Sequence, residues 1–307
     1  MEISVIIPLY RCNEHIELLT GRLVNSLCLF SKDFEIIYIN DGSPDNDWRS
    51  VLSLAEVDKR IKGVNLSRNF GQHYAITAGL QNSSGNWIVV MDGDLQDQPE
   101  EIIKLFKKAQ QGYDIVLAMR TNRQDSWLKR FFSKIFYSVF SYLTDTEQDA
   151  SVANFGIYHR DVVNAILNMK DSIRYFPTMV HWVGFNRTKI TVEHARRSVG
   201  KSSYNFGALM KLAFNNMIAF SDKPLRLTVS FGFLLTALSL LFGFITFIKY
   251  LNGSIMVPGY ASIILSIWFL GGLIIAIVGI VGIYVGKVFE KVKDRPTYII
   301  SSKINFE

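Results

Sequence analysis

Short apolar runs alternate with amphipathic segments along the first 120 residues of the chain. Runs rich in β-branched residues predict buried parallel strands, and they lie at Ile3–Ile7, Phe34–Ile39, Ile61–Leu66, Trp87–Met91 and Asp114–Ala118. Helical segments are expected between them, at His15–Phe30, Trp48–Ala55, His73–Gln81 and Pro99–Gln110. This alternation of strands and helices predicts an α/β fold with a doubly wound, mostly parallel sheet.

The last third of the chain has a different pattern, with two long stretches that lack charged side chains. No charged residue lies between Arg226 and Lys249, and none lies between Lys249 and Lys287. As a helix, Leu227–Ile248 rises roughly 33 Å, enough for a hydrocarbon core of about 30 Å. A second span is expected at roughly Ala261–Gly286. These lengths favour two C-terminal transmembrane helices over two buried core helices.

Basic side chains lie at the outer ends of the two spans. Lys211, Lys223 and Arg226 precede the first span, and the connecting loop carries only Lys249. Four basic residues follow the second span, namely Lys287, Lys291, Lys293 and Arg295. The positive-inside rule therefore predicts a multi-pass protein with both termini in the cytoplasm and a short external loop.

The remaining bulk features exclude several classes of protein. The net charge of +6 fits a basic surface beside anionic lipids, and the sequence has no nucleic-acid-binding motif. Met1 and Glu2 lead straight into the first predicted strand, without the basic region of a signal peptide. Cys12 and Cys28 give neither a disulfide framework nor a metal-ligand spacing. Dinucleotide-binding and P-loop glycine motifs are also absent.

These patterns divide the chain into four parts. Residues 1–204 are expected to form a cytoplasmic domain, 205–226 an amphipathic juxtamembrane segment, 227–286 the two spans, and 287–307 a cytoplasmic tail. Residues 126–143 predict a very aromatic helix, for which a core helix and an interfacial helix both remain open. Phe206–Phe220 repeats this pattern directly before the first span, so a position in the headgroup plane is favoured.

Two carboxylates with one residue between them follow the predicted strand Trp87–Met91. Asp92 and Asp94 would then lie at the carboxyl end of a strand, where open α/β sheets bind their ligands. Hard oxygen ligands of this kind suit Mg²⁺ or Mn²⁺ shared with substrate phosphates. A polar turn is the alternative for this motif alone, because Asp-Gly is common in turns.

Five ordered motifs resemble those of the family 2 glycosyltransferases, and the likeness covers the whole chain. It is greatest to the polyprenyl-phosphate hexose synthases, such as dolichyl-phosphate mannose synthase and bactoprenol glucosyltransferase. The motifs are Ser4–Tyr10, Asn40–Ser43, Leu66–Gly71 with Thr77–Leu80, Asp92–Asp97 and Arg197–Tyr204. The resemblance implies a nucleotide-diphospho-sugar transferase fold of the GT-A type.

The resemblance also implies roles for individual residues. Pro8, Tyr10 and Asp41 would line the uridine pocket of a UDP-sugar donor, and the metal and diphosphate would be held by Asp92, Asp94 and Gln96. A metal neutralises the leaving charge as a Lewis acid. The acceptor phosphate would be held by fixed cationic and hydroxyl donors, at Arg120, Lys129, Arg130, Ser133 and Arg197. Asp94, Arg120 and Arg197 are the residues expected to act in catalysis, although the basic residues could instead be solvated surface side chains.

The sequence departs from the family pattern at a few positions. Asn40 replaces the first aspartate of the usual pair, and Cys12 stands where many relatives carry an acid. Asn154 replaces an acid and Gly156 an arginine on the expected acceptor side. These changes leave open which sugar is transferred and whether a carboxylate base takes part; the nearby acids Asp145, Glu147 and Asp149 are equivalent candidates.

The favoured function is that of an inverting glycosyltransferase of the bacterial inner membrane. It would move a sugar from a UDP-sugar to undecaprenyl phosphate at the cytoplasmic face, for modification of cell-envelope glycans such as lipopolysaccharide. Transfer of a modified pentose such as formyl-aminoarabinose is one alternative, and a non-catalytic nucleotide-sugar sensor or scaffold is another. A processive polysaccharide synthase is disfavoured, because it would need more spans and a Gln-x-x-Arg-Trp motif, and the sequence has neither. Small residues of the second span offer a packing face for the first span or for a second protomer, at Gly272, Ala276, Gly279, Gly282 and Gly286.

Overall fold

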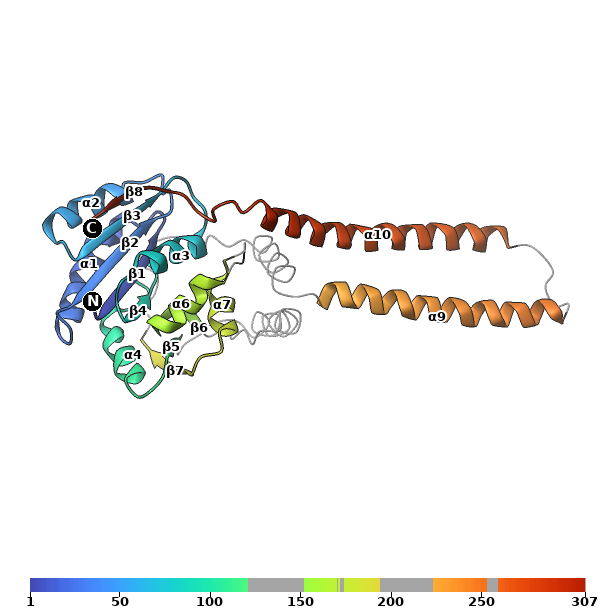
Figure 1. Cartoon of the computed structure of the whole chain (residues 1–307), viewed down its shortest axis with the longest axis horizontal. Coiled ribbons are helices and arrows are strands. Elements are labelled where there is room, and N and C mark those ends of the chain that lie inside the picture. The colour runs from blue at the N-terminus through green and yellow to red at the C-terminus, as the bar shows by residue number, and fades with distance from the viewer. Residues whose placement is uncertain (121–151, 170, 172–173, 194–222, 253–258, 307) are drawn as a thin grey trace. The chain divides into compact units, whose positions relative to one another are not determined.

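The structure is a computed structural model of the whole chain, and it describes residues 1–120, 152–169, 171, 174–193, 223–252 and 259–306. Two compact units are present. One contains the sheet and its helices and includes the C-terminal residues from Pro296 onward, and the other contains α9 (Lys223–Leu251) and α10 (Tyr260–Val292) (Figure 1). The predicted helices at 126–143 and 206–220 lie outside the described residues.

The sheet has eight strands among the described residues, in the order β7-β5-β6-β4-β1-β2-β3-β8. Six of the strands run in one direction, whereas β6 and β8 run opposite to their neighbours, so the sheet is mixed. The strands are β1 (Ile3–Leu9), β2 (Phe34–Asn40), β3 (Ile61–Leu66), β4 (Trp87–Val90), β5 (Ile115–Arg120), β6 (Val152–His159), β7 (Arg187–Val192) and β8 (Ile300–Ile304).

Helices cover both faces of this sheet, as the doubly wound pattern predicts. One group packs together over one face, with α1 (Asn13–Cys28), α2 (Asp47–Val57), the 3-10 turn η1 (Pro99–Glu101) and α4 (Ile102–Ala109). The other group contains α3 (Gln72–Asn82), α6 (Arg160–Asn168) and α7 (Phe176–Trp182). The predicted strands and helices of residues 1–120 are confirmed to within a few residues at each end.

Alternating side chains of β1 and β2 point to these two faces. Ile3, Val5 and Ile7 join the core cluster that includes Ile16 and Leu19 of α1. On the other face α3 lies very close to the sheet, because a Cβ added at Gly79 would come within 2.4 Å of Ile6 Cγ2 and 2.8 Å of Ile39 Cδ1. This close approach fixes α3 relative to the central strands.

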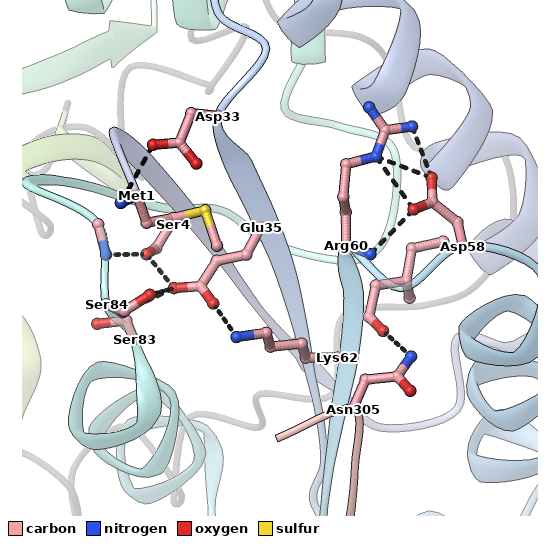
Figure 2. Close-up of polar contacts among 12 residues, drawn as sticks. Met1, Ser4, Asp33, Glu35, Asp58, Arg60, Lys62, Ser83, Ser84 and Asn305 are labelled. Atoms are coloured by element: carbon pink, nitrogen blue, oxygen red, sulfur yellow. Dashed lines mark hydrogen bonds and ion pairs between the residues drawn. The ribbon is translucent and has the colours of Figure 1, made fainter. Parts of the chain in front are cut away.

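A polar cluster lies near the amino-terminal ends of the central strands (Figure 2). The carboxylate of Glu35 in β2 is fully buried and accepts hydrogen bonds from Ser4 Oγ at 2.6 Å, Ser84 N at 2.7 Å and Ser84 Oγ at 2.9 Å. Lys62 Nζ of β3 lies 2.7 Å from Glu35 Oε2. The cluster therefore ties three strands to the loop that joins α3 to β4.

The C-terminal residues form a strand that the sequence pattern did not predict. β8 pairs antiparallel with β3 at the edge of the sheet, with Val64 opposite Lys303 and Gly63 opposite Ile304. Lys303 Nζ donates to Asn82 Oδ1 at 2.6 Å. The expected tail 287–307 thus contributes its first residues to α10 and its last ones to the sheet.

Among the described residues, Phe269–Phe289 is long and apolar enough to cross a membrane, with a mean hydropathy of 2.4 and none of its most apolar window buried. This segment belongs to α10 and overlaps the second predicted span. The first predicted span lies within α9, in which the apolar stretch found among the described residues is shorter, at Leu225–Leu235. The pair of spans therefore remains a prediction.

Candidate active site

The carboxyl ends of β1, β2, β3 and β4 lie at one edge of the sheet, because these four strands are parallel neighbours. Leu9 pairs with Asn40, and Asn40 pairs with Asn65. Three of the five motifs reach the loops that follow β2, β3 and β4, at Asn40–Ser43, Leu66–Gly71 and Asp92–Asp97, and the motif Ser4–Tyr10 is β1 with the residue after it. The edge is therefore the candidate active site, as ligand binding at the carboxyl ends of parallel strands predicts.

Asp41 follows β2 and is only 3% exposed. Its Oδ1 accepts a hydrogen bond from Phe70 N at 2.7 Å, and its Oδ2 accepts one from Gly71 N at 2.9 Å. Burial raises the pKa of Asp41 above its usual range, although these two bonds and the Arg68 charge oppose the shift. Both carboxylate oxygens therefore hold the backbone that follows β3, besides any contact with a nucleoside.

Asn40, which replaces the usual aspartate, also connects β2 to β3. Its Nδ2 donates to Asn65 Oδ1 at 2.8 Å, and its Oδ1 accepts from Ser43 N at 3.2 Å. The amide is suited to this position because it can donate and accept at once, whereas an ionised aspartate only accepts. Two residues after Asn40, glycine is required at position 42, since Gly42 has φ +59° and a Cβ there would come within 2.4 Å of the Arg68 carbonyl carbon.

The loops after β1 and β2 border a hollow of about 630 Å³, lined by Arg11, Cys12, Asn13, Glu14, His15, Pro44, Asp45 and Asn46. Pro8 is buried in β1. Tyr10 is 45% exposed and directly precedes Arg11, the first lining residue of this hollow. Cys12 N donates to Asp47 Oδ2 at 3.1 Å. Burial raises the pKa of the Cys12 thiol to about 11, helped by the charges of Asp47, Asp94 and Asp92. Cys12 is thus neutral at pH 7, where an acid would add a charge.

Asp92, Asp94 and Gln96 follow β4 in a tight turn, in which Leu95 has φ +61°. Gln96 N donates to Asp94 Oδ1 at 3.2 Å, and Asp92 N donates to Asp97 Oδ2 at 3.3 Å. All three predicted ligands are half-buried. The structure therefore places both carboxylates at the predicted edge, next to the tip of β1.

The side-chain oxygens of Asp92, Asp94 and Gln96 fit a hard divalent cation that is shared with a substrate. Among the described residues, no group of three or more His, Cys, Asp or Glu side chains forms a closed metal site. Two half-buried carboxylates at a strand tip suit Mg²⁺ or Mn²⁺, which are usually held by one or two carboxylates, water and substrate phosphates. The side-chain oxygen of Gln96 is chemically suited to the same ion.

The predicted acceptor side is only partly described. Arg120 ends β5, whose direction matches that of β4, so its backbone lies at the same edge of the sheet. Lys129, Arg130, Ser133 and Arg197 lie outside the described residues, as do Asp145, Glu147 and Asp149.

Two departures from the family pattern lie in β6, the strand between β4 and β5. Gly156 pairs with Val90, and a Cβ there would come within 2.9 Å of the Tyr158 hydroxyl and 3.0 Å of Val116 O. The site thus leaves little room for a larger side chain. Asn154 comes two residues before Gly156, toward the active edge.

Sequence reasoning missed two polar side chains at the start of α3. Gln72 Nε2 donates to Asp92 Oδ1 at 2.7 Å. His73 has a ring 4.6 Å from that of Tyr175, and burial lowers its pKa to about 4, so it is neutral at pH 7. Their place directly after the Leu66–Gly71 motif, at the tip of a parallel strand, is the signal that could have revealed them.

Comparison with known proteins agrees with this geometry. The family model described as glycosyl transferase family 2 matches residues 4–176. An uncharacterized glycosyltransferase of Synechocystis sp. is 36% identical over 302 residues, covering 98% of this chain and 95% of that protein. A prophage-derived bactoprenol glucosyl transferase of Shigella flexneri is 33% identical over 301 residues, covering 98% and 97%.

A third relative is the undecaprenyl-phosphate 4-deoxy-4-formamido-L-arabinose transferase of Shewanella sediminis, which is 32% identical over 301 residues and is covered to 91%, with 97% of this chain. The match extends over nearly the full length of all three relatives. Since the family model also spans more than half of the chain, this protein belongs to glycosyl transferase family 2.

Proposed function

We propose that this protein is an inverting glycosyltransferase that moves a sugar from a UDP-sugar to undecaprenyl phosphate at the cytoplasmic face of the bacterial inner membrane. The product, a polyprenyl-phosphate sugar, would serve the modification of cell-envelope glycans. The observation that carries the proposal is the pair Asp92 and Asp94 at the tip of β4, in a chain that aligns almost end to end with a bactoprenol and an undecaprenyl-phosphate transferase.

Different residues of the active edge would bind the nucleoside and the diphosphate of the UDP-sugar donor. Asp41 fixes the loop after β3, and with Pro8 and Tyr10 it would border the nucleoside. Asp92, Asp94 and Gln96 would hold Mg²⁺ or Mn²⁺, which when bound neutralises the charge of the departing diphosphate. The acceptor oxygen would attack C1 of the sugar as the C1–O bond to the nucleotide breaks, which inverts the anomeric centre.

The acceptor is an anion that needs fixed positive charges. Arg120 and Arg197 offer planar forks suited to a phosphate, and Lys129, Arg130 and Ser133 would complete its site. A phosphate monoester with a second pKa near 6 is largely a dianion at neutral pH. The acceptor therefore needs little help from a protein base.

The membrane part of the proposal follows from α9 and α10. Both helices would cross the bilayer, with Asn252–Tyr260 outside and both termini in the cytoplasm, on the side of the nucleotide donor.

The proposal is tested by release of UDP from the full-length protein in detergent, with and without undecaprenyl phosphate. We expect release that depends on the acceptor and on Mn²⁺, and that EDTA stops reversibly. Asp94→Ala should abolish it, whereas Glu17→Ala, which removes an exposed acid of α1, should not. A nucleotide-sugar sensor would release no UDP, and full activity of Asp94→Ala in metal-free buffer would remove the metal from the mechanism.

The sugar is distinguished by a panel of UDP-sugars in the same assay. The formamido-arabinose transferase is almost as similar to this chain as the bactoprenol glucosyl transferase, at 32% against 33% identity. A UDP-linked formamido-pentose therefore belongs in the panel beside UDP-glucose and UDP-N-acetylglucosamine. Preference for the pentose by kcat/KM would select the alternative within the same class of reaction.

A further inference from the structure

Gln72 is the first residue of α3, and its side chain reaches across to the tip of β4. Its Nε2 donates a hydrogen bond to Asp92 Oδ1 over 2.7 Å. A bond of this length and type restricts the rotation of the Asp92 carboxylate. None of the roles assigned above to the active edge uses Gln72.

The backbone that carries Gln72 is itself fixed by Asp41. Phe70 N and Gly71 N both donate to the Asp41 carboxylate, and Gly71 O accepts from Tyr74 N at 3.0 Å and Ala75 N at 3.1 Å. Gly71 has φ +109°, a conformation that side-chain-bearing residues rarely adopt. The start of α3 is therefore set by the residue expected to border the nucleoside.

The body of α3 cannot slide to relax this arrangement. Gly79 lies against Ile6 of β1 and Ile39 of β2, with no space for even one added carbon atom. Gln72 is thus presented to Asp92 from a helix that is fixed at its first turn by Asp41 and farther along by the sheet. Since α3 packs on β1 and β1 pairs directly with β4, both partners of the hydrogen bond are held by the same sheet.

We infer that Gln72 is a positioning residue that orients Asp92 for the divalent cation and couples the nucleoside end of the donor site to its diphosphate end. The inference rests on the proposed function. Removing a residue that hydrogen-bonds to a ligating carboxylate and orients it typically weakens metal affinity by roughly ten- to a hundredfold. Loss of the Gln72 amide should have an effect of that size on the metal and little direct effect on the nucleoside.

The test is the dissociation constant of Mn²⁺ for full-length protein in detergent with saturating UDP, measured by titration calorimetry. Gln72→Met keeps the length and most of the volume of the side chain but removes the donor. Gln72→Asn keeps the amide on a side chain one methylene shorter. Gln110→Met, at an exposed position after α4, is the matched control. The melting temperature of each variant is measured in parallel.

We expect both Gln72 variants to bind Mn²⁺ roughly ten- to a hundredfold more weakly than the wild type and to melt at the wild-type temperature. The control Gln110→Met should match the wild type in both Mn²⁺ affinity and melting temperature. Wild-type Mn²⁺ affinity in Gln72→Met would overturn the inference and leave the proposed function standing. A loss of affinity accompanied by an equal early melting in both variants would show a structural role instead. Absence of Mn²⁺ binding by the wild type with UDP would overturn the metal site and this inference together.

Discussion

Glu35 offers a sharp test of what holds the sheet together, because its carboxylate is fully buried among polar partners (Figure 2). It is the second residue of β2, whose other end forms part of the active edge. Glu35→Ala would leave three donors of Ser4 and Ser84 without their acceptor and Lys62 without its counter-ion. Breaking a buried ion pair by removing one partner costs about 3–5 kcal/mol. Lys62 is 18% exposed and regains part of its hydration, which favours the lower half of that range.

Glu35→Gln separates the hydrogen bonds from the charge. Its amide oxygen can still accept from Ser4 and Ser84, and only the contact with Lys62 is lost, so a cost of about 1–3 kcal/mol is expected. In a domain of this size each kcal/mol lowers the melting temperature by roughly 2–4 °C. We therefore expect Glu35→Ala to melt roughly 6–16 °C early and Glu35→Gln less early, while Glu56→Ala, at an exposed position of α2, matches wild type.

The pH dependence supplies the refutation. Burial by itself raises the pKa of Glu35, but the Lys62 ion pair and the hydrogen bonds from Ser4 and Ser84 outweigh it and hold the pKa below its usual value. A lowered folded pKa stabilises the protein above the unfolded pKa, and this stabilisation is lost as the pH falls through the folded pKa. The gap in melting temperature between wild type and Glu35→Gln, followed by tryptophan fluorescence, should therefore narrow steadily below about pH 5. A gap that is absent at pH 7, or that persists unchanged in acid, would contradict the assignment.

Three further predictions concern the acceptor, the membrane and the C-terminal strand. Arg197→Ala should lower kcat/KM for polyprenyl phosphate by roughly ten- to a hundredfold, as expected for a charge-assisted hydrogen bond, and leave the affinity for the UDP-sugar unchanged. Arg197→Lys should recover part of the loss, whereas loss of donor binding in Arg197→Ala would assign Arg197 to the nucleotide side. A cysteine replacing Ser254 should react with an impermeant thiol reagent in intact cells and one replacing Ser302 should not, and the reverse pattern would invert the topology. Asn305→Ala should lower the unfolding free energy by about 1–3 kcal/mol, because its amide donates to two backbone carbonyls and its φ is +61°; a melting curve identical to that of wild type would show that the β8 end is not anchored.

The pattern of residues predicted the central sheet because burial on both faces leaves a clear signal. β1 and β2 are buried at every position, so their apolar runs were recognisable without any partner. β6 and β8 were not predicted, for different physical reasons. β6 inserts between β4 and β5 in the opposite direction, and the order of strands across a sheet is set by chain crossings that local periodicity does not encode. β8 is an edge strand with three exposed central residues, so its sequence has little apolar character.

The candidate site divides along the same line. Asp92 and Asp94 were predictable because they directly follow a recognisable strand, and their chemistry is evident from residue type. The contacts of Asn40, Asp41 and Gln72 were not, since each joins a residue at one strand tip to a partner 20 to 30 positions away. Such pairs form only once the strands are in register and Gly42 allows two loops to approach closely.

These contacts form one connected series from β2 to β4. Asn40 links β2 to β3, Asp41 fixes the loop after β3, and Gln72 extends from that loop to Asp92. We therefore expect a substitution at the proposed nucleoside end to change the position of groups at the proposed diphosphate end, even without a direct contact between them. If this is how the site is built, the effects of Asn40→Asp and Gln72→Met on Mn²⁺ affinity should be non-additive, because residues in one hydrogen-bond network couple whereas independent sites add.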